Sequence, residues 1–345
     1  MKKLFSILAI IAISVQLFAW TPPSNVPTPT LPSNTNVRVV AANVQNYLDD
    51  FTASNRSCVD QEQFDKKTAK MANVFVYLQA DIVALCEVQQ DDNILSYLVD
   101  EMNNIVGDNR YEYVLDGTSC QTGTGGYVSI KCGYIYNTNK LTEGKQYSAY
   151  PSNNTFKNRM RIVPFTLRKN NERFILSLNH FQAKTSDSSG TQRKTQATQL
   201  INALKTNYGD PDILIVGDLN ETTTEAAVAS LISAGYAEQL VKYDEKAYSY
   251  TYYGDRQLID HALANSSMAQ QITGAYPFHI NTTSNTAYSY SDHDCILVGI
   301  NLGGTDIDEV TADATVPQRK LVYRNGQILI QVEDAFFDMM GRKVE

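Results

Sequence analysis

The sequence predicts an α+β fold with two central mixed sheets and helices on the outside. Three observations lead to this prediction. Short apolar runs rich in β-branched residues, such as 212–216 and 295–300, are typical of buried strands. Longer segments between such runs, such as 63–78, carry apolar residues at helical spacing. The chain also has 345 residues, 43% of them hydrophobic, and can therefore bury a sizeable core.

The predicted elements alternate along the chain. The segment 36–42 is β-like, and 63–78 is expected to be a helix because Phe64, Met71 and Val74 share one face. Further strands are expected at 81–86, 111–115, 128–136, 162–167, 174–178, 212–216, 258–263 and 295–300, and further helices at 94–106, 191–204 and 225–234. Because strands are interleaved with helices, two sheets in the middle with helices outside are the simplest arrangement.

The first 19 residues resemble a secretory signal peptide. Lys2 and Lys3 precede a mostly apolar stretch, which ends in a plausible cleavage site after Ala19. The stretch is shorter than the ~20 residues of a membrane-spanning helix. We therefore expect an exported protein, periplasmic, cell-surface or extracellular, with no integral membrane segment after cleavage.

Three further parts follow the signal peptide. Residues 20–36 are rich in Pro, Thr and Ser and are expected to form a linker outside the core. The main domain is expected at 37–302. In the remainder, 303–345, a polar linker leads to two short β-like runs around Asn325-Gly326, which favours a hairpin. The segment 320–345 is therefore either a small β appendage or, by its resemblance to terminal segments of secreted bacterial proteins, a sorting tail.

The charge of the chain limits the ways in which it can bind a partner. The formal net charge is −8, which argues against unspecific adhesion to nucleic acid. It does not exclude nucleic acid, because a local basic strip or a bound divalent ion can receive phosphates on an acidic protein. No protein partner is inferred.

The five cysteines divide into two groups. Cys86 and Cys295 lie in apolar runs and are expected to be buried thiols. Cys58, Cys120 and Cys132 lie in or beside polar segments, and export would permit a disulfide between one pair of them. Their spacing shows no zinc signature.

Polar residues stand at the ends of the apolar runs. The run 212–216 is followed by Asp218 and Asn220, which can point the same way from an extended chain. The same residues could also simply cap the next helix. The run 81–86 delivers Glu87 at its carboxyl end, where it is either a ligand for a hard divalent cation or an ordinary exposed glutamate.

Three of the four histidines stand beside an acid or amide at the end of a run. They are His180 after Asn179, His261 after Asp260, and His293 between two aspartates. A histidine oriented by a carboxylate is the usual arrangement of a general base. His279 is expected to be structural.

The order of these motifs resembles the endonuclease/exonuclease/phosphatase superfamily, whose members include DNase I, repair exonucleases, sphingomyelinases and inositol phosphatases. The resemblance covers about 37–302. It is carried by five motifs in the order of the superfamily: Ala42-Asn43-Val44-Gln45-Asn46, Asp81-Ile82-Val83-Ala84-Leu85-Cys86-Glu87, Asn179-His180-Phe181, Gly217-Asp218-Leu219-Asn220 and Ser291-Asp292-His293-Asp294. It implies a four-layer α/β/β/α sandwich of the DNase I type.

The resemblance also implies the site. Glu87 would hold a metal, with Asn43 and Asp292 close to it. His293 would be general base or acid, oriented by Asp260, and His180 would donate to the scissile phosphate. The remaining roles are a phosphate contact for Arg159, with Arg161 as the alternative, and positioning of water or phosphate by Asp218 and Asn220. The metal is expected to be Mg²⁺, with Mn²⁺ or Ca²⁺ as alternatives.

Hydrolysis of a phosphodiester needs an activated water and neutralised phosphate oxygens. Either Asp218 or the Asp260–His293 pair would take the proton of the water. Two departures from the superfamily stand out: no acid lies near the start of 130–136 to orient His180, and Cys295 replaces the usual proline.

The resemblance favours nucleic acid as substrate. The segment 179–184, followed by Arg193 and a helix, is most similar to bacterial extracellular nucleases, and the polar loop 185–192 would face a nucleic-acid backbone or only solvent. The main alternative is a secreted, sphingomyelinase-like phosphodiesterase or phosphatase acting on lipid headgroups or small phosphate esters. An apolar hairpin for membrane contact is not evident in the sequence. A second alternative is a catalytically silent binding protein on the same scaffold.

Overall fold

A computed structural model of the chain describes residues 20–91, 93–116, 126–147, 158–207, 212–282, 287–303, 319–324, 327–332, 335–337 and 343–344. The chain divides into two compact units, one ending at Leu302 and the other beginning at Gly303. The predicted signal peptide and Cys120 lie outside the described residues. No helix in the described ranges is long and apolar enough to cross a membrane.

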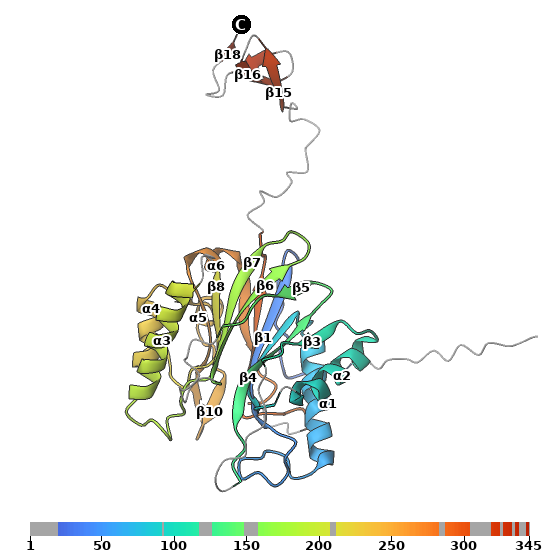
Figure 1. The fold of residues 1–345 in the computed structure, drawn as a ribbon, viewed down its shortest axis with the longest axis vertical. Helices are drawn as coiled ribbons and strands as arrows, with labels where there is room; N and C mark the ends of the chain where they lie inside the picture. The colour runs from blue at the N-terminus through green and yellow to red at the C-terminus, as the bar shows by residue number, and fades with distance from the viewer. Residues whose placement is uncertain are drawn as a thin grey trace, which may run out of the picture. The chain divides into compact units, whose positions relative to one another are not determined.

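Two six-stranded mixed sheets form the centre of the first unit (Figure 1). The first has the order β13-β14-β1-β2-β4-β3 and comprises β1 (Val37–Tyr47), β2 (Ile82–Gln89), β3 (Tyr111–Tyr113), β4 (Ile130–Asn137), β13 (Ile272–Phe278) and β14 (Cys295–Ile300). The second has the order β5-β6-β7-β8-β12-β9 and comprises β5 (Leu141–Glu143), β6 (Met160–Leu167), β7 (Arg173–Asn179), β8 (Ile213–Asp218), β9 (Ala237–Glu238) and β12 (Asp260–Ala264). The pairs β1–β2 and β7–β8 are parallel.

The core between the sheets follows from the alternation of side chains along each strand. In β1, Val37, Val39 and Ala41 belong to the cluster that both sheets share. Val40 and Ala42, on the other face, belong to the cluster under the first pair of helices. Each sheet therefore contributes one face to the inter-sheet core and one face to an outer core.

Helices cover the outer face of each sheet (Figure 1). The helices α1 (Gln61–Tyr77) and α2 (Ile94–Val106) pack on the first sheet, and α3 (Thr191–Asn207) and α4 (Ala226–Ser233) pack on the second. The side chain of Asp60 accepts a hydrogen bond from Gln63 N and fixes the start of α1. Two shorter helices are α5 (Gln239–Tyr243) and α6 (Ser266–Gln271). The predicted four-layer sandwich is confirmed.

All strands and helices predicted between 36 and 300 are present with shifted ends, but the pattern missed several short elements. These are β5, β9, α5, α6 and the hairpin of β10 (Tyr250–Tyr252) and β11 (Asp255–Gln257). Runs of two or three residues carry too little periodicity to be recognised. The strand β13 was missed because it contains Gly274 and Pro277. Both residues are tolerated there because β13 is an edge strand that pairs only with β14.

The segment 20–36 differs from the expectation. It has no helix or strand, but Val26 and Leu31 are buried and belong to the outer core of the first sheet. Leu31 lies over Gly274 and Gly299, where an added Cβ would come within 2.8 Å of its methyl groups. The prediction of a linker outside the core is therefore wrong for Val26 and Leu31. For Leu31 the reason is that Gly274 and Gly299 leave space that its side chain fills.

The second unit contains a four-stranded antiparallel sheet in chain order. Its strands are β15 (Arg319–Arg324), β16 (Gln327–Val332), β17 (Ala335–Phe337) and β18 (Lys343–Val344). β15 and β16 pair from Arg319–Val332 to Arg324–Gln327, on either side of the predicted turn, whose two residues lie outside the described ranges.

Among the described residues, no disulfide joins the loop cysteines that the sequence would allow to pair. Cys58 and Cys132 are both buried free thiols, as are Cys86 and Cys295. The prediction for Cys132 was wrong because its strand lies inside the sandwich, where its side chain joins the inter-sheet core.

Candidate active site

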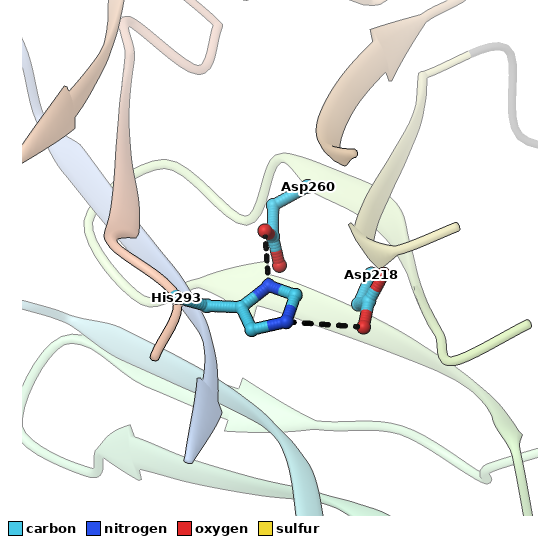
Figure 2. A group of neighbouring side chains, drawn as sticks. All are labelled: Asp218, Asp260 and His293. Carbon is cyan, nitrogen blue, oxygen red and sulfur yellow. Dashed lines mark hydrogen bonds and ion pairs between the residues drawn. The ribbon is translucent and has the colours of Figure 1, made fainter. Parts of the chain in front are cut away.

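The predicted site residues converge at one end of the inter-sheet core. Asp218 and Asp260 continue the inward faces of β8 and β12 beyond Val216 and Ala262. The two aspartates are direct partners in the antiparallel ladder, so the sheet itself places them side by side. His293, from the segment before β14, lies between them (Figure 2). Strands of both sheets therefore fix the centre.

Gly217 explains why β7 and β8 can meet so closely. Its φ is +119°, and a Cβ there would lie 2.1 Å from the carbonyl oxygen of Asn179. A side chain is excluded at this position. The main chain of Asn179 therefore rests on Gly217, which brings His180 beside Asp218.

Asp218 is the central group of the site. Its Oδ2 accepts a hydrogen bond from Asn43 Nδ2 at 3.0 Å, and its Oδ1 accepts one from the backbone N–H of Asn220 at 2.9 Å. The Nε2 atoms of His180 and His293 lie 3.8 and 3.9 Å from the same Oδ2. A carboxylate buried between two imidazoles is suited to exchange protons.

His293 is held from its far side by Asp260. The Nδ1 of His293 lies 2.7 Å from Asp260 Oδ2, and its Nε2 faces Asp218 (Figure 2). The backbone N–H of Asp260 donates to Ser249 Oγ. The ring of Tyr250 lies against the imidazole, with centroids 4.6 Å apart. The His293 ring is therefore fixed by a carboxylate at one edge and an aromatic ring on one face.

These contacts raise the pKa values of both Asp218 and His293. Burial raises the pKa of Asp218 to about 7, with His293 opposing the rise and Asp260 adding to it. Burial works against the charge of His293, but Asp260 and Asp218 outweigh it and raise the pKa of His293 to about 10. At neutral pH, His293 is an imidazolium and Asp218 can accept a proton.

His180 is neutral and has a defined tautomer. Burial and the charges of Arg159 and His293 hold the pKa of His180 well below its usual value. Its Nδ1 lies 3.5 Å from Arg159 Nη1, which can only donate. The proton of the imidazole is therefore on Nε2, which points toward Glu87 Oε1 at 3.6 Å. The sequence left open what orients His180, and the structure places Arg159 there in place of an acid.

Glu87 is presented by an irregular end of β2. The register between β2 and β4 shifts here, and Glu87 has a φ of +66°. Positive φ in a non-glycine residue is a strained conformation that often marks functional sites. The carboxylate accepts hydrogen bonds from Asn43 Nδ2 and from the backbone N–H of Asn46, both at 3.0 Å.

The donor set around Glu87 fits a hard divalent cation. Glu87 and Asp218 share the single amide donor of Asn43, and neither forms an ion pair with a lysine or arginine in the described part of the chain. Carboxylate oxygens are ligands that such cations prefer. The amide oxygen of Asn43 accepts from the backbone N–H of Gln45 at 2.9 Å and would have to turn to join them. Asp218, Asp260 and His293 also form a group whose ligand atoms lie within 4.8 Å of one another. Within that group, Asp260 already holds the Nδ1 of His293 at 2.7 Å.

Two predicted residues are placed differently from the expectation. Asp292 is exposed, accepts only a long contact from Ser291 Oγ at 3.4 Å, and makes no hydrogen bond to Glu87 or Asn43 within the described residues. Asn220 donates its side-chain amide to the carbonyl of Phe181 and so ties two loops together.

The two candidate arginines have separate environments. Arg159 lies beside His180, whereas Arg161 is buried against Asp116, with Nη2 2.8 Å from Oδ2. Lys131 contacts the same carboxylate at 3.1 Å. Arg161 therefore belongs to a structural ion cluster, and Arg159 is the arginine of the site.

The other two histidines are bonded away from the centre. His261 contacts Glu238 through Nδ1 and the carbonyl of Glu221 through Nε2, both at 2.7 Å. His279 contacts Asp294 at 2.8 Å, which agrees with the structural role expected for it.

Arg193 does not face a substrate. Its side chain is 3% exposed and pairs with Glu221 at 2.8 Å and with Asp187 at 3.6 Å. It holds the loop before α3 in place, so its presence is not evidence for nucleic-acid contact.

Sequence reasoning missed the aromatic hairpin beside the site. Tyr250, Tyr252 and Tyr253 belong to the β10–β11 hairpin, and Tyr250 bridges to the backbone of His293. Tyr252 is 53% exposed and Tyr253 is 93% exposed. The repeated tyrosines of 248–253 were a signal in the sequence, but only the hairpin shows that they lead to His293.

The chain matches the model of the Endonuclease/Exonuclease/phosphatase family over residues 38–292. Solved structures with the same fold include a mannosyl-6-phosphatase of Bacteroides thetaiotaomicron, with 15% identity over 76% of this chain and 98% of that one and a TM-score of 0.56. The human Nocturnin catalytic domain has 15% identity over 78% and 94%, with a TM-score of 0.54. D. rerio TDP2, complexed with a single-strand DNA product, has 16% identity over 76% and 98%, with a TM-score of 0.51. Among curated proteins, no match is found.

Proposed function

Because the chain belongs to the endonuclease/exonuclease/phosphatase family, we propose that it is a metal-dependent phosphodiester hydrolase, and specifically an exported endonuclease that cleaves DNA or RNA. One observation carries the proposed chemistry. Asp218, with a pKa raised to about 7, lies between a neutral histidine and an imidazolium. The arrangement supplies a proton acceptor and two proton donors around one small space.

In the proposed reaction, Asp218 accepts the proton of the attacking water. His293, charged and held by Asp260, donates to the phosphate or to the leaving oxygen. Between the two candidates for the general base, the pKa values favour Asp218, because His293, with a pKa raised to about 10, is already protonated at neutral pH and cannot accept the proton.

His180 and Arg159 would neutralise the phosphate. The Nε2–H of His180 points into the same space as Asp218, and Arg159 adds a permanent positive charge beside it. Hydrogen bonds from such fixed donors stabilise charge that develops on the phosphate oxygens.

Glu87 and Asn43 would hold the metal, with Asp218 bordering it, and we propose Mg²⁺ as the natural ion, with Mn²⁺ or Ca²⁺ as substitutes. When bound, the cation supplies positive charge to the phosphate and the leaving group.

Nucleic acid is the proposed substrate because an aromatic surface starts at the catalytic centre. Tyr250 lies against His293 and is followed by Tyr252, with ring centroids 6.5 Å apart. Stacking on aromatic side chains is a common way to bind bases without sequence preference. The similar fold of D. rerio TDP2, solved with a DNA product, is compatible with this substrate.

A plasmid-nicking assay tests the proposal. Purified mature protein is incubated with supercoiled plasmid in Mg²⁺, in EDTA, and as the His293→Ala variant. Cutting that needs the metal and is absent in the variant is expected. If neither plasmid nor single-stranded RNA is cut with any divalent ion, the nuclease proposal fails. If no phosphate ester at all is hydrolysed, the chain is a binding protein on this scaffold.

The β10–β11 hairpin favours one second candidate, a phosphodiesterase or phosphatase of lipid headgroups or small esters. The sequence showed no apolar hairpin, but Tyr252 and Tyr253 form an exposed aromatic tip, and tyrosine is common at membrane interfaces. Vesicles of sphingomyelin, sedimented with wild type and with Tyr252→Ser/Tyr253→Ser, distinguish the two. Loss of vesicle binding together with loss of lipid hydrolysis would favour this candidate.

Export is part of the proposal and rests on residues 1–19. Expression of the full chain in a bacterial host, followed by N-terminal sequencing of the secreted fraction, is expected to find Trp20 as the first residue. A protein that retains Met1 and stays in the cytoplasm would contradict export.

A further inference from the structure

A basic cavity of about 290 Å³ lies beside the reaction centre. Its wall is formed by α1 on one side and by the segment 289–291 on the other. Three lysines of α1, Lys66, Lys67 and Lys70, line it. This concentration of positive charge is notable in a chain whose formal net charge is −8.

Lys67 is the innermost of the three. The residue is 7% exposed, and its ammonium donates to the carbonyl of Gln45 and to Ser57 Oγ, each at 2.8 Å. In the described ranges, no carboxylate lies within ion-pairing distance of it. Burial lowers the pKa of Lys67 to about 8, with the charges of Cys58, Glu87 and Asp292 opposing the shift. The fold therefore keeps a buried ammonium with neutral partners only, which is costly unless an anion completes its contacts.

The other two lysines add charge at the rim. Lys66 is exposed and pairs with Glu62, and Lys70 donates to the carbonyl of Ser289 at 3.0 Å. Burial lowers the pKa of Lys70, and the like charge of Lys66 lowers it further. An anion in the cavity would relieve this repulsion.

Two short hydrogen-bonded connections join the cavity to the reaction centre. Gln45, which lines the cavity, donates its N–H to Asn43 Oδ1 at 2.9 Å. Ser291, on the opposite wall, donates Oγ to the carbonyl of Asn43 at 2.7 Å. Asn43 in turn donates to Glu87 and Asp218. Residues that line the cavity are therefore bonded directly to Asn43, one of the proposed metal ligands.

We propose that this basic cavity binds a second phosphate group of the substrate, on the same molecule as the phosphate that is hydrolysed. The inference rests on the proposed function and narrows the substrate class to esters with at least two phosphates. Lysine ammoniums bind phosphate as compact point charges with rotatable donors, so no fixed orientation of the second group is needed. The second phosphate comes either from the neighbouring position of a nucleic-acid strand or from the other end of a small bisphosphate.

Kinetics with matched substrates test the cavity. The double variant Lys66→Gln/Lys70→Gln is compared with Lys194→Gln/Lys205→Gln, which makes the same charge change at exposed positions of α3. Lys67→Met removes the buried ammonium and keeps much of its volume. The reference substrate is bis(4-nitrophenyl) phosphate, which has a single phosphate.

Two substrate arms distinguish the sources of the second phosphate. One arm uses a thymidine trinucleotide and analogues in which one phosphate at a time is replaced by a neutral methylphosphonate. The other is adenosine 3′,5′-bisphosphate compared with adenosine 3′-phosphate. For the substrate whose second phosphate occupies the cavity, the cavity variants are expected to raise KM about tenfold. They are also expected to make KM less dependent on salt, because substrate binding releases fewer counterions when a phosphate contact is lost. Activity on the reference substrate is expected to be unchanged.

The proposal is overturned if neutralising the neighbouring phosphate, or removing it, leaves KM the same in the wild type, or if the α3 control behaves like the cavity variants. A binding measurement separates this failure from failure of the proposed function. Inorganic pyrophosphate is expected to protect Lys66 and Lys70 from acylation, as mapped by mass spectrometry, and Lys67→Met is expected to abolish this protection. Protection without hydrolysis of any substrate would reject the proposed enzymatic function and keep the anion site. Hydrolysis without protection would keep the enzymatic function and reject the anion site.

Discussion

Two histidine–carboxylate pairs involve residues on opposite faces of the same strand, and we propose that only one of them takes part in catalysis. In β12, Asp260 points into the space between the sheets and holds His293 at 2.7 Å. The next residue, His261, points to the helix-covered face and contacts Glu238 at the same distance. The two pairs match in length and burial, so neither property distinguishes the proposed catalytic pair from the other.

The difference lies in the second nitrogen of each ring. The Nε2 of His261 is bonded to the carbonyl of Glu221 at 2.7 Å, so both nitrogens have fixed partners. The Nε2 of His293 lies 3.9 Å from Asp218 Oδ2, which is too far for a hydrogen bond. The two groups can therefore both reach a substrate atom placed between them. A histidine is available for chemistry when one nitrogen is held and the other is not.

The sharpest test of this comparison is the pair of glutamine variants. His293→Gln is expected to lower kcat/KM about 10³-fold, within the range of general acid–base contributions, and also to lower stability, because Asp260 loses its charged partner. His261→Gln is expected to retain most activity. Both are checked by steady-state hydrolysis of bis(4-nitrophenyl) phosphate. Equal losses in the two variants would mean that the second nitrogen does not decide the role.

Removal of the metal ligand is expected to have the next largest effect. Glu87→Gln keeps the shape of the side chain and removes its charge, so we expect about 10²-fold lower activity at limiting Mg²⁺ and partial recovery at high Mg²⁺. A metal titration of wild type and variant measures the shift. An unchanged titration curve would place the cation at Asp218, Asp260 and His293 instead.

Variants of Arg159 and Arg161 are expected to have smaller effects, one on activity and the other on stability. Arg159→Met is expected to lower kcat/KM about tenfold to a hundredfold, because one charged contact to the phosphate is lost. Arg161→Met breaks the contact with Asp116 and is expected to lower thermal stability with little effect on kcat/KM. Activity and melting curves of both variants are compared. An activity loss in Arg161→Met at a temperature where it remains folded would reverse the assignment.

The smallest expected effect is the dependence of stability on pH through His261. Burial opposes its charge, but the hydrogen bond and charge of Glu238 outweigh burial and raise the pKa of His261 above its usual value. A group whose folded pKa is raised stabilises the fold fully below its unfolded pKa and loses this effect as pH rises through the folded pKa. His261→Gln is therefore expected to cost about 1–3 kcal/mol at about pH 6 and less at about pH 9. Urea unfolding at both values measures this, and a cost that grows with pH would show the opposite sign.

The parts of the site that the sequence could predict are those that depend on strand ends. Asp218 and Glu87 follow apolar runs, and a run that must be buried carries its terminal side chain to a fixed place. The same logic fails for Asp292, since the alternation beside His293 turns its side chain outward.

Other features depend on contacts between distant segments, which no local pattern contains. Tyr250 becomes part of the site only because the β10–β11 hairpin bridges to His293. Lys67 looks like any lysine of an amphipathic helix, until the fold brings it to the carbonyl of Gln45. The segment 20–36 was predicted as a linker because composition cannot show that two glycines of the first sheet leave room for Leu31.

Gly217 has a consequence for redesign. The spacing between His180 and Asp218 is set by one peptide carbonyl resting on a residue without a side chain, so it is a property of the main chain. An engineer can therefore vary the lysines of α1 or the tyrosines of the hairpin without altering that spacing. A library that includes position 217 would instead lose most of its active members, whatever substrate it is selected for.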